Sequence, residues 1–393
     1  MAVPLPRFKV MLHTHLDGHL RHSTIMELAK AKNIDLGYTS LQDCLKKTKP
    51  WKPSTLQNYL KEMPNFLRVV VGDRDALTRV AYEAGVDQAN AGVIYSEMRL
   101  FAQMMSSAST ALPKGSTPPT LNSTKDVVEA VLAGFKKAED LCGIKCRLVL
   151  ACFRDKPEWA DEVVALCQEY NGKGVVGMDV CGVFAPKKTE TEGEEILHPD
   201  VIKAFQKAAT LGVHRTVHAG EAGPASNVAR AIEELRTERI GHGYAAMRDG
   251  GAPFQLALDR GIHFEVCPNS SYLTGAVSPG ERHPILSLRD HCASYSLNTD
   301  DPTITHTRIS DEYQLALKLG FRPDDILESN RAAIEASFLS PEEKRELRCK
   351  FERLNASPSY SSCFYDCGSP RKTVRNSDVS SSKLTSNGVV SCH

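Results

Sequence analysis

The stretch FKVMLHTH, residues 8–15, has the composition of a β-strand and ends in two histidines. Seven further β-rich runs follow it along the chain, and helix-like stretches lie between them. The eight expected strands are Phe8–His15, Gly92–Arg99, Lys145–Phe153, Gly174–Gly182, Arg215–Glu221, Arg239–Gly243, His263–Pro268 and Ser294–Pro302. Strands that alternate with helices in this way predict an α/β fold, a closed (β/α)8 TIM barrel rather than an open sheet.

The segments between the expected strands carry apolar residues at helical spacing. Clear examples are Asp126–Cys142, Pro199–Leu211 and Ser226–Leu235. Residues 16–91, between the first two expected strands, are long enough for several helices and also read as helical. We therefore expect a helical insertion after the first strand.

Two segments have the composition of irregular structure. Residues 106–124 are rich in Ser, Pro and Thr, which is typical of a long loop. From about Ser357 the chain is Ser-rich and has few large apolar residues, so it lacks the means to form a core. We expect a barrel over residues 1–355 and a disordered tail over residues 356–393.

Composition and charge exclude some classes of function. Lys plus Arg and Asp plus Glu both total 48, so the formal net charge is zero. Nucleic-acid and anionic-membrane surfaces need clustered basic charge, so neither partner is expected. No apolar run reaches the roughly 18 residues of a membrane span, and the N-terminal segment has no apolar stretch of signal-peptide length. We expect a cytoplasmic protein whose 12 cysteines are free thiols.

Polar residues recur where the expected strands end. They are His13, Glu97, Asp179, His218, His242 and Asp300. Because chemistry in (β/α)8 barrels collects at the carboxyl ends of the strands, we treat these residues as one constellation.

The strongest local signal is His13-Thr14-His15. Side chains two apart on a strand share a face, so both imidazoles can point into the mouth of the barrel. An isolated His-x-His is more often two unrelated polar residues. Here strand order adds His218 from across the mouth and Asp300 from the neighbouring last strand. Three imidazole nitrogens and one carboxylate oxygen suit Zn²⁺ with a position left for water.

Five segments, taken together, resemble the signature segments of the adenosine deaminase family. They are HTHLDG (13–18), TVHAGE (216–221), TERIGHGY (237–244), SSYLTGA (270–276) and SLNTDDP (296–302). The resemblance covers residues 5–350. It implies a hydrolase of purine metabolism that converts adenosine, and 2′-deoxyadenosine, to inosine or 2′-deoxyinosine and ammonia. It also implies one zinc ion per subunit, with the ligands His13, His15, His218 and Asp300.

The resemblance assigns the catalytic groups to Glu221, His242 and Asp300. Glu221 protonates purine N1, a general-acid contribution of ~10²–10⁴-fold, and must be protonated at neutral pH to do so. His242, between Gly241 and Gly243, orients or deprotonates the attacking water. From position alone, Glu221 could also be a solvated helix cap and His242 a structural residue.

The substrate-binding residues implied by the resemblance are His15, Asp17, Gly182 and Asp301. Asp301 holds purine N7, Asp17 binds the ribose 5′-hydroxyl, and the main-chain N–H of Gly182 meets purine N3. Small molecules are therefore the expected partners. Some animal members of the family also have a partner at the cell surface, but no contact surface for one can be identified in this sequence.

Two further features bear on the substrate pocket. The family often has acidic residues directly after the glycine that corresponds to Gly182, whereas Val183 and Phe184 follow it here. Four apolar residues match positions that form a gate over the nucleoside in the family. These residues, at i, i+3, i+4 and i+7 of an expected helix, are Leu56, Tyr59, Leu60 and Met63. Ordinary core packing explains their spacing equally well.

Several other functions compete with adenosine deamination. Nucleotide deaminases need basic groups near the ribose 5′ position, where Asp17 would repel a phosphate. Adenine deamination stays open as an alternative, because the contacts to the base do not require ribose. A cytidine-deaminase type of site needs a PCxxC pair, which the sequence lacks. A two-metal amidohydrolase usually has a bridging Lys at the end of the fourth strand, where Asp179–Gly182 has none. A non-catalytic binding protein would hold zinc without turnover.

Overall fold

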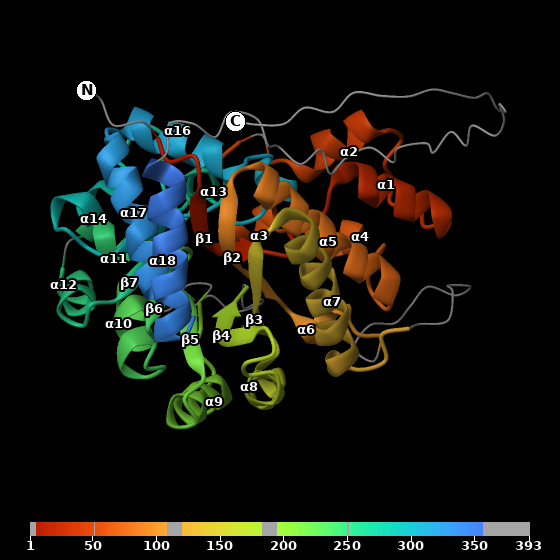
Figure 1. The fold of residues 1–393 in the computed structure, drawn as a ribbon, viewed down its shortest axis with the longest axis horizontal. Coiled ribbons are helices and arrows are strands. Elements are labelled where there is room, and N and C mark those ends of the chain that lie inside the picture. The colour runs from red at the N-terminus through yellow and green to blue at the C-terminus, as the bar shows by residue number, and fades with distance from the viewer. Residues whose placement is uncertain (1–4, 51, 108–119, 183–194, 250, 357–393) are drawn as a thin grey trace, which may run out of the picture.

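The computed structural model describes residues 5–50, 52–107, 120–182, 195–249 and 251–356. Its centre is one sheet of eight strands in sequence order, each parallel to the next (Figure 1). The strands are β1 (Lys9–His15), β2 (Val93–Leu100), β3 (Lys145–Phe153), β4 (Val175–Cys181), β5 (His214–Ala219), β6 (Arg239–His242), β7 (His263–Val266) and β8 (Tyr295–Leu297). The predicted (β/α)8 barrel is confirmed.

The barrel closes between β8 and β1 mainly through one buried amide. Asn298 Oδ1 accepts hydrogen bonds from the main-chain N–H groups of Leu12 (2.8 Å) and His13 (3.0 Å). Further along both segments, the main-chain N–H of His15 donates to the main-chain carbonyl of Asp300 at 2.8 Å. The expected last strand, Ser294–Pro302, is thus shorter than predicted, and its second half joins β1 through these bonds.

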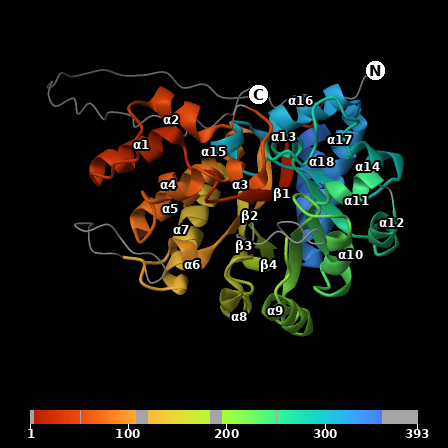
Figure 2. The same ribbon diagram turned by 180° about the vertical axis from the view of Figure 1, so that it is seen from behind.

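Helices fill the long connection after β1, as the sequence predicts. They are α1 (His22–Ala31), α2 (Leu41–Thr48), α3 (Leu56–Tyr59), α4 (Met63–Leu67) and α5 (Arg74–Asn90). The remaining helices are α6 (Ala102–Met105), α7 (Thr124–Cys142), the 3₁₀ helix η1 (Pro157–Trp159), α8 (Ala160–Glu169), α9 (Pro199–Thr210), α10 (Ser226–Glu233), α11 (Tyr244–Asp249), α12 (Ala252–Asp259), α13 (Pro268–Leu273), α14 (Leu286–Asp290), α15 (Pro302–Thr305), α16 (Ile309–Leu319), α17 (Pro323–Ala336) and α18 (Pro341–Ala356). Helices α1 and α2 lie at one end of the molecule, opposite α12 and α14 (Figure 2).

Helix α7 illustrates how local sequence sets an element and its packing. Ser123 and Asp126 form a reciprocal capping box at its start, and Gly143 ends it with a φ of 68°. Gly134 lets α5 approach closely, because a Cβ there would lie 2.4 Å from the carbonyl oxygen of Thr78. The backbones of α5 and α7 therefore approach each other closely, and the two helices pack against β2 and β3.

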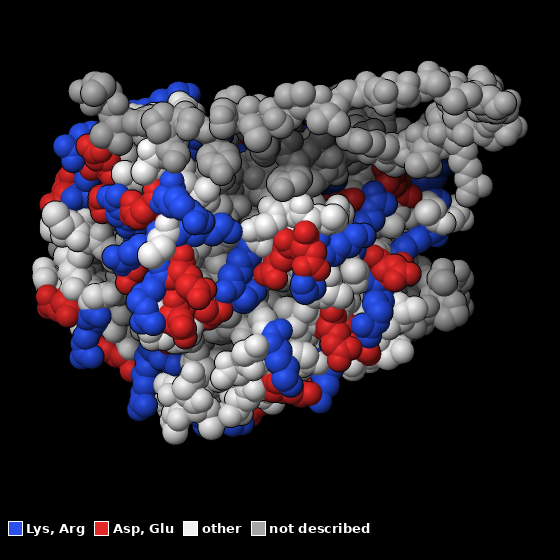
Figure 3. Space-filling view, viewed as in Figure 1, with Lys and Arg blue, Asp and Glu red and all other residues white. Residues whose placement is uncertain are grey.

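Membrane spans, surface charge and cysteines can be stated for the described segments. Within the described segments, no helix is long and apolar enough to cross a membrane. Basic and acidic side chains intermingle on the face drawn in Figure 3. The nine cysteines in the described ranges are all free. Most of the expected loop at residues 106–124, and the tail from Ser357, lie outside the described residues.

Candidate active site

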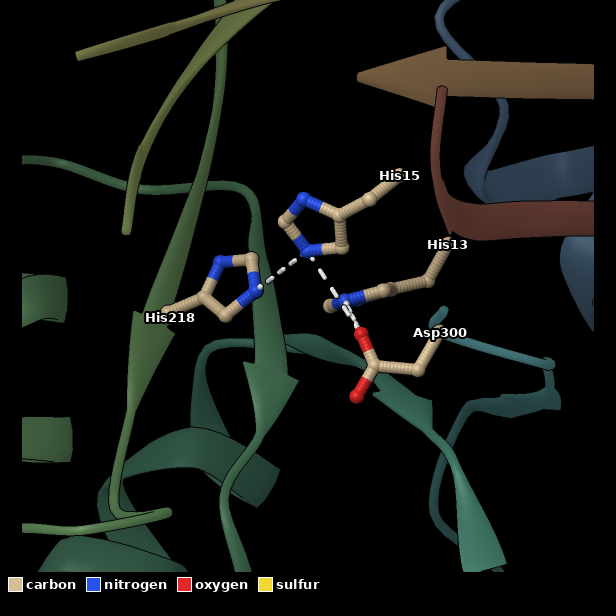
Figure 4. Close-up of side chains that lie close together, drawn as sticks. All are labelled: His13, His15, His218 and Asp300. Atoms are coloured by element: carbon tan, nitrogen blue, oxygen red, sulfur yellow. Dashed lines mark hydrogen bonds and ion pairs between the residues drawn. The ribbon is translucent and has the colours of Figure 1, made fainter. Parts of the chain in front are cut away.

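Four side chains from three strands converge at the carboxyl end of the barrel (Figure 4). His13 and His15 end β1, His218 lies near the end of β5, and Asp300 follows β8. His15 Nε2 lies 3.3 Å from His218 Nε2 and 3.5 Å from Asp300 Oδ1. His13 Nε2 lies 3.3 Å from the same carboxylate oxygen.

These distances fit a metal ion bound by all four atoms. Corners of a tetrahedron with bonds of about 2.0–2.1 Å lie about 3.3–3.4 Å apart, and the three atom pairs given above lie 3.3, 3.3 and 3.5 Å apart. One ligand atom from each residue lies within 4.8 Å of the others. Burial, the largest cause, lowers the pKa values of His15 and His218 well below the ordinary value, so both imidazoles are neutral and can bind a metal. The predicted cluster is therefore brought together.

Two carboxylates stand behind the imidazoles. Glu265 Oε2 accepts a hydrogen bond from His13 Nδ1 at 2.9 Å, and Asp179 Oδ2 lies 2.9 Å from His218 Nδ1. Both acidic residues are fully buried. A carboxylate on Nδ1 selects the tautomer that leaves the Nε2 lone pair free for a metal and holds the ring in orientation.

One arginine links these two carboxylates. Arg99, fully buried in β2, donates to Asp179 Oδ2 and to Glu265 Oε2, both at 2.6 Å. Arg239 pairs with Glu265 Oε1 and with Glu97 Oε2, both at 2.7 Å. Alternating charges therefore fill the barrel beneath the histidines, and buried charge is tolerated there because every member is paired. The ion pair of Glu97 with Arg239 involves none of the four ligand residues.

His242 and Glu221 lie beside the cluster. His242 Nε2 is 3.6 Å from Glu221 Oε2, and its ring centroid is 4.7 Å from that of His13. Burial, and then the charges of Asp300 and Glu195, raise the pKa of Glu221 well above its ordinary value. Burial lowers the pKa of His242 well below its ordinary value. The arrangement thus pairs a protonated carboxyl with a neutral imidazole.

Backbone strain is concentrated at this site. His242 has a φ of 67° and Asp300 a φ of 61°, in the left-handed region that most side chains avoid. Such residues cost on the order of 1–3 kcal/mol each and persist where their surroundings hold them. For Asp300 the holding contact is Ser270, whose hydroxyl donates to Oδ2 at 2.5 Å. Burial by itself would raise the pKa of Asp300. The facing imidazoles of His13 and His242 outweigh this effect and hold the pKa of Asp300 well below its ordinary value.

The cluster opens into a cavity of about 200 Å³ with mostly apolar walls. The lining residues are His15, Asp17, Leu56, Tyr59, Leu60, Met63, Pro64, Phe101, Met104, Phe153, Cys181, Gly182, His218, Glu221, His242, Asp300 and Asp301. None of these described residues is Lys or Arg. Hollows of about 530 and 710 Å³ elsewhere contain none of the four ligand residues, so chemistry rather than size identifies the site.

The expected helix over residues 56–63 is wrong in one respect. The structure has two short helices, α3 and α4, separated by a turn at residues 60–62. All four apolar residues nevertheless line the cavity, and Tyr59 and Met63 are also buried in the core. Their spacing therefore serves core packing at Tyr59 and Met63, and the gate over the nucleoside stays a prediction.

Three residues expected to bind substrate surround the cavity. Asp17 is 2% exposed and neither of its carboxyl oxygens has a hydrogen-bond partner among the described residues. Burial raises the pKa of Asp17 to about 7. Burial and the charge of Asp300 raise the pKa of Asp301, which accepts a hydrogen bond from the Tyr59 hydroxyl at 3.1 Å. Gly182 has a φ of 84°, and a Cβ there would lie 2.3 Å from Phe153.

Sequence reasoning missed the groups that support the cluster. From the sequence, Glu265 and Arg99 have no expected role, Tyr59 is expected only in the apolar gate over the nucleoside, and Asp179 only as a polar strand end. Ser270 lies inside one of the signature segments, SSYLTGA, which was the available signal for it. The charged residues inside expected strands were the signal for the others, because charge in a strand buried on both faces requires partners.

The sequence matches the family described as adenosine deaminase over residues 8–353. It is 39% identical to adenosine deaminase of Danio rerio over 342 residues, which cover 86% of this chain and 93% of the relative. An amidohydrolase of Burkhoderia ambifaria with bound Zn aligns with a TM-score of 0.73 at 25% identity, over 88% of this chain and 91% of the other. The N6-mAMP deaminase of Arabidopsis aligns with a TM-score of 0.72 at 27% identity, over 89% and 98%.

Proposed function

Because the chain belongs to the adenosine deaminase family, we propose that it hydrolyses adenosine to inosine and ammonia at the cavity beside His13, His15, His218 and Asp300. 2′-Deoxyadenosine is a second substrate in this proposal. The observation that carries it is the convergence of three imidazole Nε2 atoms and one carboxylate oxygen next to a buried, protonated Glu221.

Zinc is the metal that these residues would hold. Three neutral imidazoles and one carboxylate are a ligand set typical of Zn²⁺ in hydrolases, and the amidohydrolase of Burkhoderia ambifaria has bound Zn. A bound zinc ion would lower the pKa of water from 15.7 to about 7 and so supply a nucleophile at neutral pH. Glu265 keeps the imidazole of His13 in the tautomer that such binding requires, and Asp179 Oδ2 lies 2.9 Å from His218 Nδ1.

Glu221 acts as the general acid. Water adds to purine carbon 6, and the electron pair that is displaced onto N1 must be met by a proton. Burial and two neighbouring carboxylates keep Glu221 protonated near neutral pH, so its carboxyl can donate that proton. The proton stays on N1 in inosine. Of the two protons of the added water, one leaves with the amino group as ammonia when the bond from carbon 6 to the amino nitrogen breaks, and the other restores the proton of Glu221.

His242 handles the proton of the attacking water. Its imidazole is neutral because burial lowers its pKa, so it can accept a proton. Its Nδ1 has no hydrogen-bond partner among the described residues, and its Nε2 lies 3.6 Å from Glu221. Asp300 shares in this step as the carboxylate held between His13 and Ser270.

The cavity's polar groups suit a purine nucleoside. N7 of a purine accepts a hydrogen bond, and the raised pKa of Asp301 makes this residue a donor. Asp17 offers unpaired carboxyl oxygens for the 5′-hydroxyl, and the tight turn at Gly182 brings a main-chain N–H toward N3. His15 also lines the cavity, so this candidate metal ligand can contact the substrate as well.

A free nucleoside is preferred to a nucleotide. None of the described cavity-lining residues is Lys or Arg, so none supplies the positive charge that a phosphate needs, and the ionised form of Asp17 would repel a phosphate. This favours adenosine over the nucleotide substrate named for the Arabidopsis relative, although its fold is similar. Adenine deaminase is the remaining competitor, because the contacts to the base do not need ribose.

A substrate panel with metal analysis tests the proposal. Purified protein is assayed for ammonia release from adenosine, 2′-deoxyadenosine, adenine, AMP and N6-methyl-AMP, and its zinc content is measured. We expect about one zinc per chain and the highest kcat/KM for adenosine. Turnover highest on a nucleotide or on adenine would overturn the substrate assignment, and zinc without any turnover would identify a binding protein.

We take residues 1–355 as the catalytic barrel and residues 356–393 as a tail that catalysis does not need. A cytoplasmic location is consistent with the nine free cysteines described.

A further inference from the structure

The turn that carries Glu221 wraps around a second carboxylate. The main-chain N–H groups of Gly220, Glu221 and Ala222 all point at the side chain of Glu195, at 2.6, 2.7 and 2.8 Å. Gly220 has a φ of 73°, which turns consecutive N–H groups toward one point. Such a concave set of main-chain donors is an anion-binding nest, and here the anion is a side chain of the same protein.

Glu195 is itself held firmly in place. It is 3% exposed, and it lies in the connection between β4 and α9, just after the part of that connection that is not described. Arg154, buried after β3, donates to the carbonyl oxygen of Glu195 at 3.2 Å and also to the carbonyl oxygen of His218. The guanidinium thus ties the Glu195 backbone to β5, three residues before Glu221.

The contact has a direct consequence for the position of Glu221. Its main-chain N–H is one of the three bound donors, so the carboxylate of Glu195 determines where the Glu221 backbone lies. The Glu221 side chain must reach a single ring nitrogen in a buried cavity. Displacement of a catalytic group by about 1 Å can cost about 10²-fold in rate.

We propose that Glu195 is a positioning residue for the general acid: its carboxylate fills the nest at residues 220–222 and fixes Glu221 toward the cavity. The inference rests on the proposed function, in which Glu221 protonates the purine. The acidic side chain that binds the turn after β5 comes from Glu195, in the connection between β4 and α9.

The test is a double-mutant cycle between Glu195 and Glu221. Glu195→Gln keeps the shape but turns an NH₂ group toward main-chain donors, so the nest loses at least one acceptor. Adenosine kcat and KM, and zinc per chain, are measured for the wild type, Glu195→Gln, Glu221→Gln and the double variant. Glu195→Asp, which keeps the charge but retracts it, goes through the same cycle, so the test does not depend on one variant folding.

We expect Glu195→Gln to lower kcat by about 10–10²-fold and to change KM and zinc content by less than about twofold. In the Glu221→Gln background the same substitution should cost less than about twofold more, because a positioning residue acts only through the group it positions. Glu195→Asp should retain more kcat than Glu195→Gln.

The matched control is Asp325→Asn. Asp325 is also a buried carboxylate that accepts a main-chain N–H, from Arg322 at 2.7 Å, but it caps α17 away from the cavity. The Asp325→Asn substitution should leave kcat unchanged. A Glu195→Gln enzyme with wild-type kcat, or effects that multiply in the double variant, would overturn the inference. An inactive wild type would instead refute the proposed function, so the two failures are distinguishable.

Discussion

Replacing Glu265 by Gln is expected to weaken zinc binding about tenfold. Glu265 is fully buried in β7, where Oε2 accepts the hydrogen bond of His13 Nδ1 at 2.9 Å. Glutamine has almost the same shape, so the substitution removes charge without opening a cavity. The imidazole of His13 then loses the charged partner that orients it and makes its Nε2 a better ligand.

The magnitude follows from that one hydrogen bond. A hydrogen bond to a charged group contributes about 1.5–3 kcal/mol, and a neutral one about 0.5–1.5 kcal/mol. The difference of about 1–1.5 kcal/mol corresponds to about tenfold in a dissociation constant. This lies at the lower end of the 10–100-fold usually lost when a supporting partner of a metal ligand is replaced.

Glu97→Gln is the matched control. Both acidic residues pair with Arg239 at 2.7 Å, so both variants leave this buried guanidinium one charge short; Glu265→Gln also removes the charge paired with Arg99 at 2.6 Å. The other partners of Glu97 are the Tyr95 hydroxyl and the main-chain N–H of Phe338, both at 2.7 Å, and neither belongs to the cluster. A general loss of stability should therefore appear in both variants, and a loss of zinc affinity only in Glu265→Gln.

The assay is competition for zinc between metal-free protein and a chromophoric chelator, with thermal unfolding of the metal-free forms measured in parallel. Zinc affinity of Glu265→Gln within about twofold of wild type would refute the supporting role of the carboxylate. Equal losses in Glu265→Gln and Glu97→Gln would show that the effect comes from the charge network as a whole.

Four further predictions concern the reaction and the chain end. Glu221→Gln should keep zinc and lose at least about 10²-fold in kcat, because the amide cannot donate as an acid; substantial activity in a steady-state assay would remove Glu221 from this role. In the wild type, kcat should fall as pH rises through the elevated pKa of Glu221, since only the protonated carboxyl is active, and a pH–rate profile without this basic limb would contradict the assignment. His15→Ala should reduce zinc per chain, measured by metal analysis; full occupancy would remove His15 from the ligand set. Deletion from Ser357 onward should leave kcat unchanged, and a large loss would show that the tail is structural.

The fold could be predicted from the sequence because its signals are local. Runs such as residues 148–153 are apolar throughout, which is typical of strands buried on both faces, and the helical spacing between the runs selects a parallel barrel. Positions two apart on a strand share a face, so His13 and His15 could be paired without a structure. Errors arose at element ends, as at residues 56–63, where spacing alone did not indicate the turn between α3 and α4.

The sequence was enough to predict the barrel and to group the four candidate ligand residues, because strand order places all the carboxyl ends at one rim, and its signature segments indicated the family. What stands behind each group became visible only in the folded protein: Glu265 behind His13, Asp179 behind His218, and Glu195 beneath the turn of Glu221. These contacts join residues tens to hundreds of positions apart, through side-chain directions and a left-handed turn. Neither the side-chain directions nor the left-handed turn produces a periodic pattern in the sequence, because both depend on how distant elements pack.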